Sequence, residues 1–341
     1  MSAAHETPTR DRLVEIVGSF SGRRIAVLAD LVVDRFIHGT PKRISREAPV
    51  LILRQDREQI RPGGGANAVM NVRALGGNPC PVGVVGDDHN GSALLEHFSG
   101  AGIDTGQVVE IAGYRTPTKT RVLAGAKHSA KQQIVRFDVE EELNLDEEAN
   151  AALAQALDRA CESSSALIVS DYGLGGIDPR LASHASRGRL CLADSRYRLT
   201  DFEGVDGATP NEEELDALEP GDPADAPRRG ERLRQRLGAS FLLLTRGSTG
   251  MVLVTEAAAV EIPVHGTDQI ADVTGAGDTV IGAFALASAA GATPLEAALL
   301  ANYAGGIVVT KLGTATASQE ELTAAIGADG RPLGELKWVD W

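Results

Sequence analysis

The chain has 341 residues and a formal net charge of −14, with 33 Lys and Arg against 47 Asp and Glu. This length suits one large α/β domain or two small ones. So acidic a surface repels nucleic acids and anionic membranes, so neither is an expected partner. The three cysteines lie far apart with no Cys-x-x-Cys pair, which is typical of reduced thiols in a cytoplasmic protein, and no apolar run approaches the roughly 18 residues of a membrane span.

Short apolar runs alternate with helical patterns along most of the chain. Residues 1–12 are polar and mixed in charge, which predicts a frayed tail and not a signal peptide, and residues 220–227 predict a polar loop. In chain order we expect a strand at 25–29, a helix at 66–75, a strand at 82–85, a helix at 147–160, strands at 166–169, 190–193 and 241–244, a hairpin of 251–254 and 260–264, and helices at 276–290 and 294–311. Such alternation predicts βα units and a parallel sheet, with ligands beyond the carboxyl ends of the strands.

Two stretches, residues 44–61 and 116–138, interrupt this alternation. Both mix apolar and charged residues and are rich in Lys and Arg, and residues 51–53 predict an exposed strand within an otherwise irregular segment. We expect the two stretches to form a small second sheet, a lid over the ends of the main strands.

The most informative segment is Asp272-Val-Thr-Gly-Ala-Gly-Asp-Thr, which runs directly into a predicted helix. The amide groups of Gly275, Ala276 and Gly277 would point at whatever lies before that helix, and such a terminus binds anions. Asp278 follows in the first turn. Phosphoryl transfer needs a group that accepts the hydroxyl proton and another that stabilises charge on the moving phosphoryl. Taken alone, Asp278 could equally just complement the helix dipole.

This segment resembles the C-terminal signature of the ribokinase-like (PfkB) carbohydrate kinases. Further resemblances are Gly63-Gly-Gly-Ala-Asn67 to their N-terminal signature, Asn211-Glu-Glu-Glu214 to their Asn-x-x-Glu motif, and Leu244-Thr-Arg-Gly247 to their nucleotide-binding turn. The resemblance covers about residues 23–318, in family order. No Gly-Lys dipeptide occurs, which excludes a Walker-type P-loop as the phosphate site.

The resemblance implies a three-layer α/β fold of the ribokinase-like type, with a mainly parallel central sheet and a small β-sheet lid. The implied division is a tail and lead-in helix over residues 1–22, a kinase domain over 23–328 and a tail over 329–341. The lid segments would lie near 35–62 and 114–138.

The resemblance also implies roles for the matching residues, with ATP, Mg²⁺ and K⁺ as cofactors. Asp278 would be the general base, with the anion hole at Gly275, Ala276 and Gly277. Mg²⁺ would bind through water at Asn211 and Glu214, and the monovalent cation at Asp272 and the Thr274 carbonyl. The nucleotide would lie near Asn211, Thr245, Arg246, Gly247 and Asn302, and the sugar near Asp34, Gly63, Gly64, Asn67 and Asp171. From the residues alone, Asn211 could simply cap a helix, with Glu214 as its first-turn acid.

The lid segments are similar to those of the D-glycero-D-manno-heptose 7-phosphate kinases, which act in the synthesis of bacterial lipopolysaccharide. The similarity includes Asp34-Arg-Phe-Ile-His-Gly39, Thr118-Lys-Thr-Arg121 and Ser170-Asp-Tyr172. The expected binders of the sugar phosphate are Lys119, Arg121, Arg136 and Arg196. Cations gathered in so acidic a chain suit an incoming phosphate, although a solvated basic face of the lid is the alternative.

Two positions depart from the heptose kinases. Leu174 stands where they usually have Lys, and Asp194-Ser-Arg196 stands where they commonly have Asp-Pro-Lys. The bifunctional members also carry a nucleotidyltransferase domain, for which 341 residues leave no room, so we expect a stand-alone kinase.

The sequence thus predicts phosphorylation of heptose 7-phosphate at C1. The alternatives are a family member acting on ribose, fructose or a fructose phosphate, and a sensor that binds nucleotide and sugar without catalysis. A sensor has no use for a base, so Asp278 favours an enzyme. We also expect a homodimer through the lids, because their strands would otherwise leave open edges.

Overall fold

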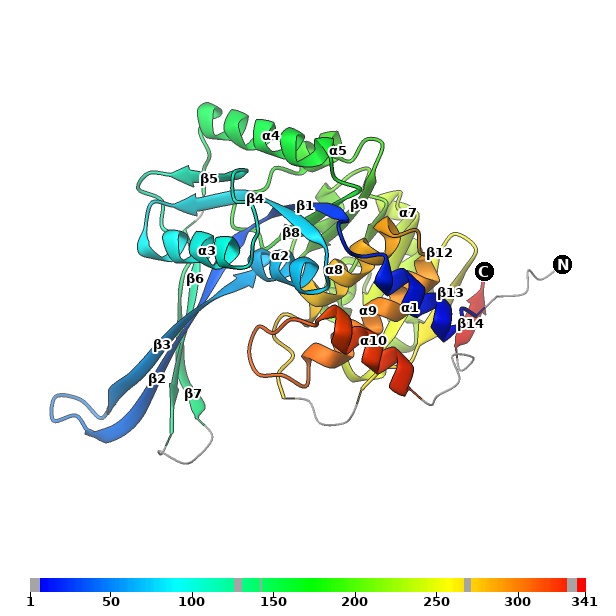
Figure 1. Ribbon diagram of the computed structural model, residues 1–341. Helices are drawn as coiled ribbons and strands as arrows, with labels where there is room; N and C mark the ends of the chain where they lie inside the picture. The colour runs from blue at the N-terminus through cyan, green and yellow to red at the C-terminus, as the bar shows by residue number, and fades with distance from the viewer. Residues whose placement is uncertain (1–6, 126–130, 142, 267–270, 330–335) are drawn as a thin grey trace.

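A computed structural model describes residues 7–125, 131–141, 143–266, 271–329 and 336–341. The body has helices on both faces of a large sheet, and a ribbon of long strands projects from it (Figure 1). Across these described ranges, no helix is both long and apolar enough to cross a membrane.

The central sheet has the strand order β14-β13-β12-β11-β10-β9-β8-β1-β4-β5. From β11 to β5 every neighbouring pair is parallel, and β12, β13 and β14 continue the sheet in antiparallel fashion. The strands are β1 (Arg24–Ala29), β4 (Asn78–Gly86), β5 (Val108–Ile111), β8 (Ala166–Asp171), β9 (Leu190–Ser195), β10 (Gly207–Ala208), β11 (Phe241–Thr245), β12 (Met251–Thr255), β13 (Ala258–Ile262) and β14 (Lys337–Asp340).

Alternate residues of each strand enter separate cores on the two faces of this sheet. Ile25 and Val27 of β1 belong to one core, while Ala26 and Leu28 belong to the other. The first core is covered by α1 (Arg10–Gly18), α2 (Gly65–Ala74), α3 (His89–Gly100), α8 (Ala276–Ala289), α9 (Pro294–Val308) and α10 (Gln319–Ala328). The second is covered by α4 (Glu147–Glu162), α5 (Pro179–Ala185), α6 (Glu212–Leu218) and α7 (Ala226–Leu237). The expected three-layer fold is confirmed.

The projecting ribbon is the lid, a separate sheet with the order β3-β2-β6-β7. Its strands are β2 (Leu31–Ile44), β3 (Leu51–Gly64), β6 (Thr118–Ala124) and β7 (Gln132–Val139). The expected second sheet is confirmed, although β3 extends well beyond the exposed strand expected at 51–53. Both β2 and β3 hold 14 residues and pair along nearly their whole length.

Three other predictions need correction. Residues 10–12, expected in a frayed tail, begin α1, which the side chain of Thr9 caps. The loop expected at 220–227 contains a 3₁₀ turn at Pro223–Asp225 and the start of α7, where a proline occupies the first turn. Within the range expected as a C-terminal tail, β14 pairs with β13.

Candidate active site

Asp278 lies in the first turn of α8, buried between α2 and the end of β8. The Asn67 amide nitrogen donates to its Oδ2 at 3.0 Å, and the Tyr172 hydroxyl donates to its Oδ1 at 3.1 Å. Asn67 is itself held by Asn71, whose side chain in turn accepts from the Thr279 hydroxyl at 2.9 Å. Each carboxylate oxygen therefore has a defined partner.

Burial raises the pKa of Asp278 to about 7. The hydrogen bonds from Asn67 and Tyr172 oppose this rise, the charge of Asp34 adds to it, and the charge of Lys119 lowers it again. A carboxylate with a pKa near neutrality can take up a proton during a reaction and lose it again afterwards.

The segment before α8 has the backbone shape of an anion site. Gly275 adopts a left-handed φ of 79°, and a Cβ at this residue would lie only 2.4 Å from the Asn67 amide nitrogen. The Ala276 amide already donates a hydrogen bond to the Val273 carbonyl at 3.2 Å. Within the described part of the chain, the amides of Gly275 and Gly277 make no such bond, so they are the better candidates for binding a phosphoryl group.

One face of the lid carries a group of charged side chains near Asp278. In the strand register Asp34 lies opposite Arg61 on one side and Lys119 on the other, and Arg121 lies opposite Arg136. The alternation of side chains puts these residues on a common face. Arg121 forms an ion pair with Asp34.

Asp34 links this lid face to Asp278, because its charge acts on that carboxyl group. Burial raises the pKa of Asp34, and the charges of Arg121, Lys119 and Arg136 oppose that rise. A Cβ at Gly63 would lie 2.6 Å from the Asp34 carboxyl group, so only glycine allows this approach, and Gly64 has a φ of 50°. The structure thus brings the predicted sugar residues Asp34, Gly63, Gly64 and Asn67 together.

Three other predicted sugar and phosphate residues, Asp171, Arg196 and Arg136, have protein partners of their own. The Asp171 carboxylate is fully buried and accepts bonds from Ser195 at 2.6 Å and from Arg198 at 2.6 and 3.1 Å, so its contact with a sugar stays a prediction. Arg196 is exposed and lies over the ring of Tyr197. Arg136 already pairs with Asp138 at 2.5 Å.

Asn211 and Glu214 form a reciprocal capping box at the start of α6, with both bonds 2.9 Å long. Asn211 therefore does cap α6, which is the alternative to a metal-binding role. The capping bond uses one carboxylate oxygen of Glu214 and leaves the other for a cation. Burial raises the pKa of Glu214. Asp194 has a pKa raised well above its ordinary value by burial, with the charge of Glu214 adding to it. Partly buried acids of this kind fit a divalent cation, although no group of three His, Cys, Asp or Glu able to hold a metal occurs among the described residues.

The predicted nucleotide residues Thr245 and Arg246 contact this start of α6. Asn211 pairs with Thr245 in an isolated bridge, and Arg246 forms an ion pair of 3.0 Å with Glu212. Gly247 follows in a left-handed conformation. Asn302 holds another loop, because its amide donates to the Pro263 carbonyl at 2.8 Å.

The Asp272 carboxylate closes the loop that precedes α8. It accepts bonds from the amides of Thr274 at 2.9 Å and Gly313 at 3.0 Å. Burial opposes its ionisation, but these bonds outweigh burial and lower its pKa. Asp272 is therefore a charged carboxylate, which suits a neighbouring monovalent cation.

Sequence reasoning assigned no site role to Tyr172, Asp194 or Arg61. Tyr172 directly follows β8 and Asp194 lies next to the last residue of β9, and such positions at the carboxyl ends of parallel strands are the signal that could have found them, whereas Arg61 lies within β3 of the lid. The bond between Tyr172 and Asp278 joins residues 106 positions apart, and no local pattern marks such a contact.

A family model described as pfkB family carbohydrate kinase matches residues 24–321. The chain is 40% identical over 332 residues to the bifunctional protein HldE of Halorhodospira halophila, covering 94% of this chain and 67% of the relative. To the bifunctional protein HldE of Chromohalobacter salexigens it is 38% identical over 319 residues, covering 90% of this chain and 64% of the relative. The chain thus spans about two thirds of the length of these relatives.

Solved structures share the fold. Phosphofructokinase-2 from Escherichia coli, in complex with substrates and products, superposes with a TM-score of 0.72 at 22% identity, covering 91% of this chain and 100% of that one. Ribokinase from Arabidopsis thaliana, complexed with ribose and ATP, gives a TM-score of 0.68 at 18% identity, covering 90% and 100%. At these identities the likeness establishes the fold, which is ribokinase-like as predicted.

Proposed function

This chain belongs to the pfkB family of carbohydrate kinases, and from that membership we propose that it transfers the γ-phosphoryl group of ATP to C1 of D-glycero-D-manno-heptose 7-phosphate. Transfer to a sugar follows from the family. The acceptor is inferred, and the observation that carries it is the set of cations on the lid face around Asp34. A neutral sugar has no need of Lys119, Arg121 and Arg61 in one place, whereas a sugar phosphate does.

In the proposed reaction, Asp278 accepts the proton of the C1 hydroxyl as its oxygen attacks the γ-phosphorus, and the bond to ADP breaks. The amides of Gly275 and Gly277 would stabilise charge on the moving phosphoryl group. Asp34 and Asn67 would hold sugar hydroxyls, while Lys119 and Arg121 would bind the distal phosphate.

We propose that Glu214 and Asn211 hold Mg²⁺ through water, with Asp194 adding negative charge nearby. When bound, Mg²⁺ neutralises charge on the phosphates of ATP. Asp272 and the Thr274 carbonyl would bind K⁺ and so fix the loop that carries the anion site. A cytoplasmic location is proposed, which fits the three free, buried cysteines.

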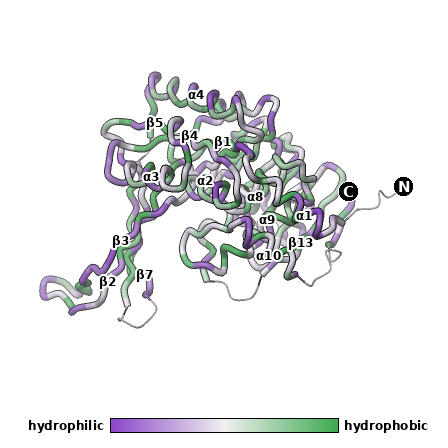
Figure 2. Tube along the Cα trace, in the orientation of Figure 1, coloured by the Kyte–Doolittle hydropathy of each residue, from purple (hydrophilic) through white to green (hydrophobic). Residues whose placement is uncertain are grey.

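A homodimer through the lids is the proposed assembly, and apolar side chains on the lid support it. Figure 2 shows hydrophobic stretches along these otherwise polar strands. Six large apolar side chains there are 44% to 67% exposed: Ile44, Val50, Leu51, Ile134, Val135 and Phe137. Light scattering at micromolar concentration should give twice the chain mass, and Phe137→Asp should halve it. A monomeric wild type would contradict this assembly.

The function is tested with ATP labelled at the γ-phosphate and purified protein, under single-turnover conditions. Label should move to C1 of heptose 7-phosphate, as read by mass spectrometry, with one ADP formed per bisphosphate. A protein that binds both ligands and leaves the label on ATP would be a sensor, and the proposal would fail.

A further inference from the structure

Tyr172 lies directly after β8, between the candidate base and the lid. Its hydroxyl donates to Asp278, and the Lys119 ammonium lies 5.3 Å from the centre of its ring. Burial raises the pKa of this phenol well above its ordinary value, and the charges of Asp278 and Asp194 raise it further. The hydroxyl therefore stays protonated and remains a donor across the working pH range.

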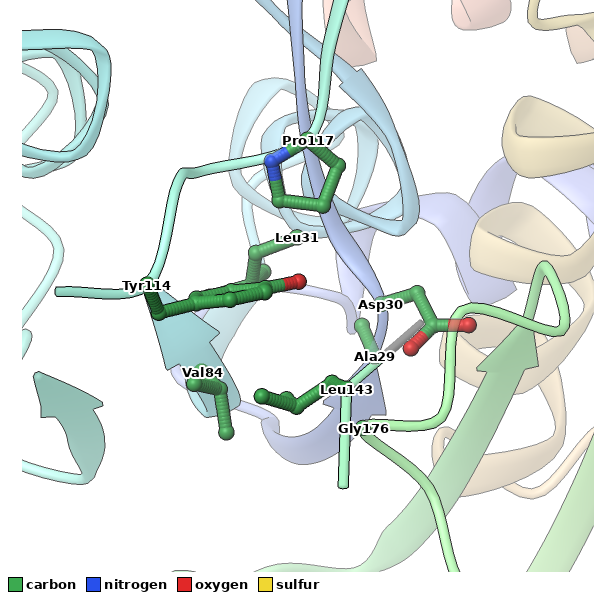
Figure 3. A pocket seen from close by; sticks show the side chains of 8 residues that line it. All are labelled: Ala29, Asp30, Leu31, Val84, Tyr114, Pro117, Leu143 and Gly176. Carbon is green, nitrogen blue, oxygen red and sulfur yellow. The ribbon is translucent and has the colours of Figure 1, made fainter. Parts of the chain in front are cut away.

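The backbone of Tyr172 is anchored by Asp30, which joins β1 to the lid strand β2. The Asp30 carboxylate accepts from the Tyr172 amide at 2.8 Å and from the Leu174 amide at 3.2 Å. Asp30 is buried at the end of β1 and borders a small cavity that Tyr114 also lines (Figure 3). Two bonds to one carboxylate oxygen fix the turn, and the turn aims the phenol at Asp278.

We propose that Tyr172 is a positioning residue for the base. Asn67 fixes one oxygen of the Asp278 carboxylate and Tyr172 fixes the other, so the carboxylate cannot rotate. A carboxylate oxygen accepts more than one hydrogen bond, so a sugar hydroxyl can still donate to the oxygen that Tyr172 holds. The inference rests on the proposed role of Asp278 as general base.

The bond also sets the pH range in which the base works. It favours the charged form of Asp278, so its loss raises the pKa of that carboxyl above about 7. The other groups facing the base remain in place: Asp34 from β2, Lys119 from β6, Asp194 from β9 and the neutral Asn67 from α2. The base acts deprotonated, so the acid limb of the rate profile moves to higher pH when the phenol hydroxyl is removed.

The test is the pH dependence of kcat in Tyr172→Phe. We expect kcat at pH 6.5 to fall about tenfold, to recover toward wild type near pH 9, and the KM values for sugar and ATP to change little. Tyr114→Phe is the matched control, because it removes another largely buried phenol hydroxyl near Asp30 that makes no bond to Asp278. Its profile should follow wild type.

A second variant should shift the acid limb in the opposite direction. 3-Fluorotyrosine at position 172 is a more acidic, stronger donor, so its acid limb should move to lower pH. An unmoved acid limb in both variants, or an equal loss of kcat at every pH, would overturn the positioning role. Asp278→Asn assayed in parallel separates the two claims: if that variant keeps its turnover, the base assignment itself has failed.

Discussion

Replacing Asp278 with Asn is expected to lower kcat by roughly 10²-fold or more, the usual scale for removing a general base. The amide cannot take the proton from the sugar hydroxyl, while the shape of the side chain is kept. ATP binding, measured by calorimetry, should survive, because the proposed nucleotide contacts lie at Thr245, Arg246 and Gly247.

The control for this variant is Asp11→Asn. Asp11 is also a first-turn acid of a helix, α1, but it is exposed and far along the chain from the site. If Asp278 only complemented a helix dipole, both variants would lose a little stability and neither would lose activity. Near-normal turnover in Asp278→Asn would contradict the mechanism.

Replacing Arg121 with Ala is expected to cost about ten- to a hundredfold in kcat/KM for heptose 7-phosphate, the scale of one charge-assisted contact to phosphate. The variant also leaves Asp34 without its ion-pair partner, and this change should lower kcat/KM for any sugar, phosphorylated or not. The quantity to measure is therefore the ratio of kcat/KM for heptose 7-phosphate to that for unphosphorylated heptose, which should fall.

Arg35→Ala is the matched control for this ratio. Arg35 directly follows Asp34 on β2, so its side chain points to the opposite face of the lid. There it forms an ion pair with Glu58 at 2.6 Å. Its removal should leave the ratio unchanged. A ratio that stays at the wild-type value in Arg121→Ala would show that the distal phosphate is not bound there.

The core of the fold could be predicted because its strands are buried on both faces. Residues 25–29 and 166–169 are continuous apolar runs, and the structure places them side by side in β1 and β8. The strands of the lid could not be predicted in the same way. Its long strands have two partly exposed faces, so charged and apolar residues mix, and their pairing depends on partners distant in sequence.

The candidate site was predictable where its residues sit in local motifs, as with Asp278 and the glycines before it. Asp171 shows the limit of such reasoning. The family resemblance implied a sugar contact for Asp171, which stays a prediction, and the structure pairs its carboxylate with Arg198, 27 positions away. Tyr172, its neighbour, contacts the base instead. Which of two adjacent polar residues faces the site depends on side-chain direction, which the sequence pattern does not specify.

The central claim, that the acceptor is a heptose 7-phosphate, is tested most directly by competition. Wild-type protein receives limiting ATP and equimolar heptose 7-phosphate, heptose, ribose, fructose and a fructose phosphate, and mass spectrometry identifies the products. We expect the heptose bisphosphate to exceed every other product by about tenfold or more. Preferential phosphorylation of ribose, fructose or the fructose phosphate would contradict the claim.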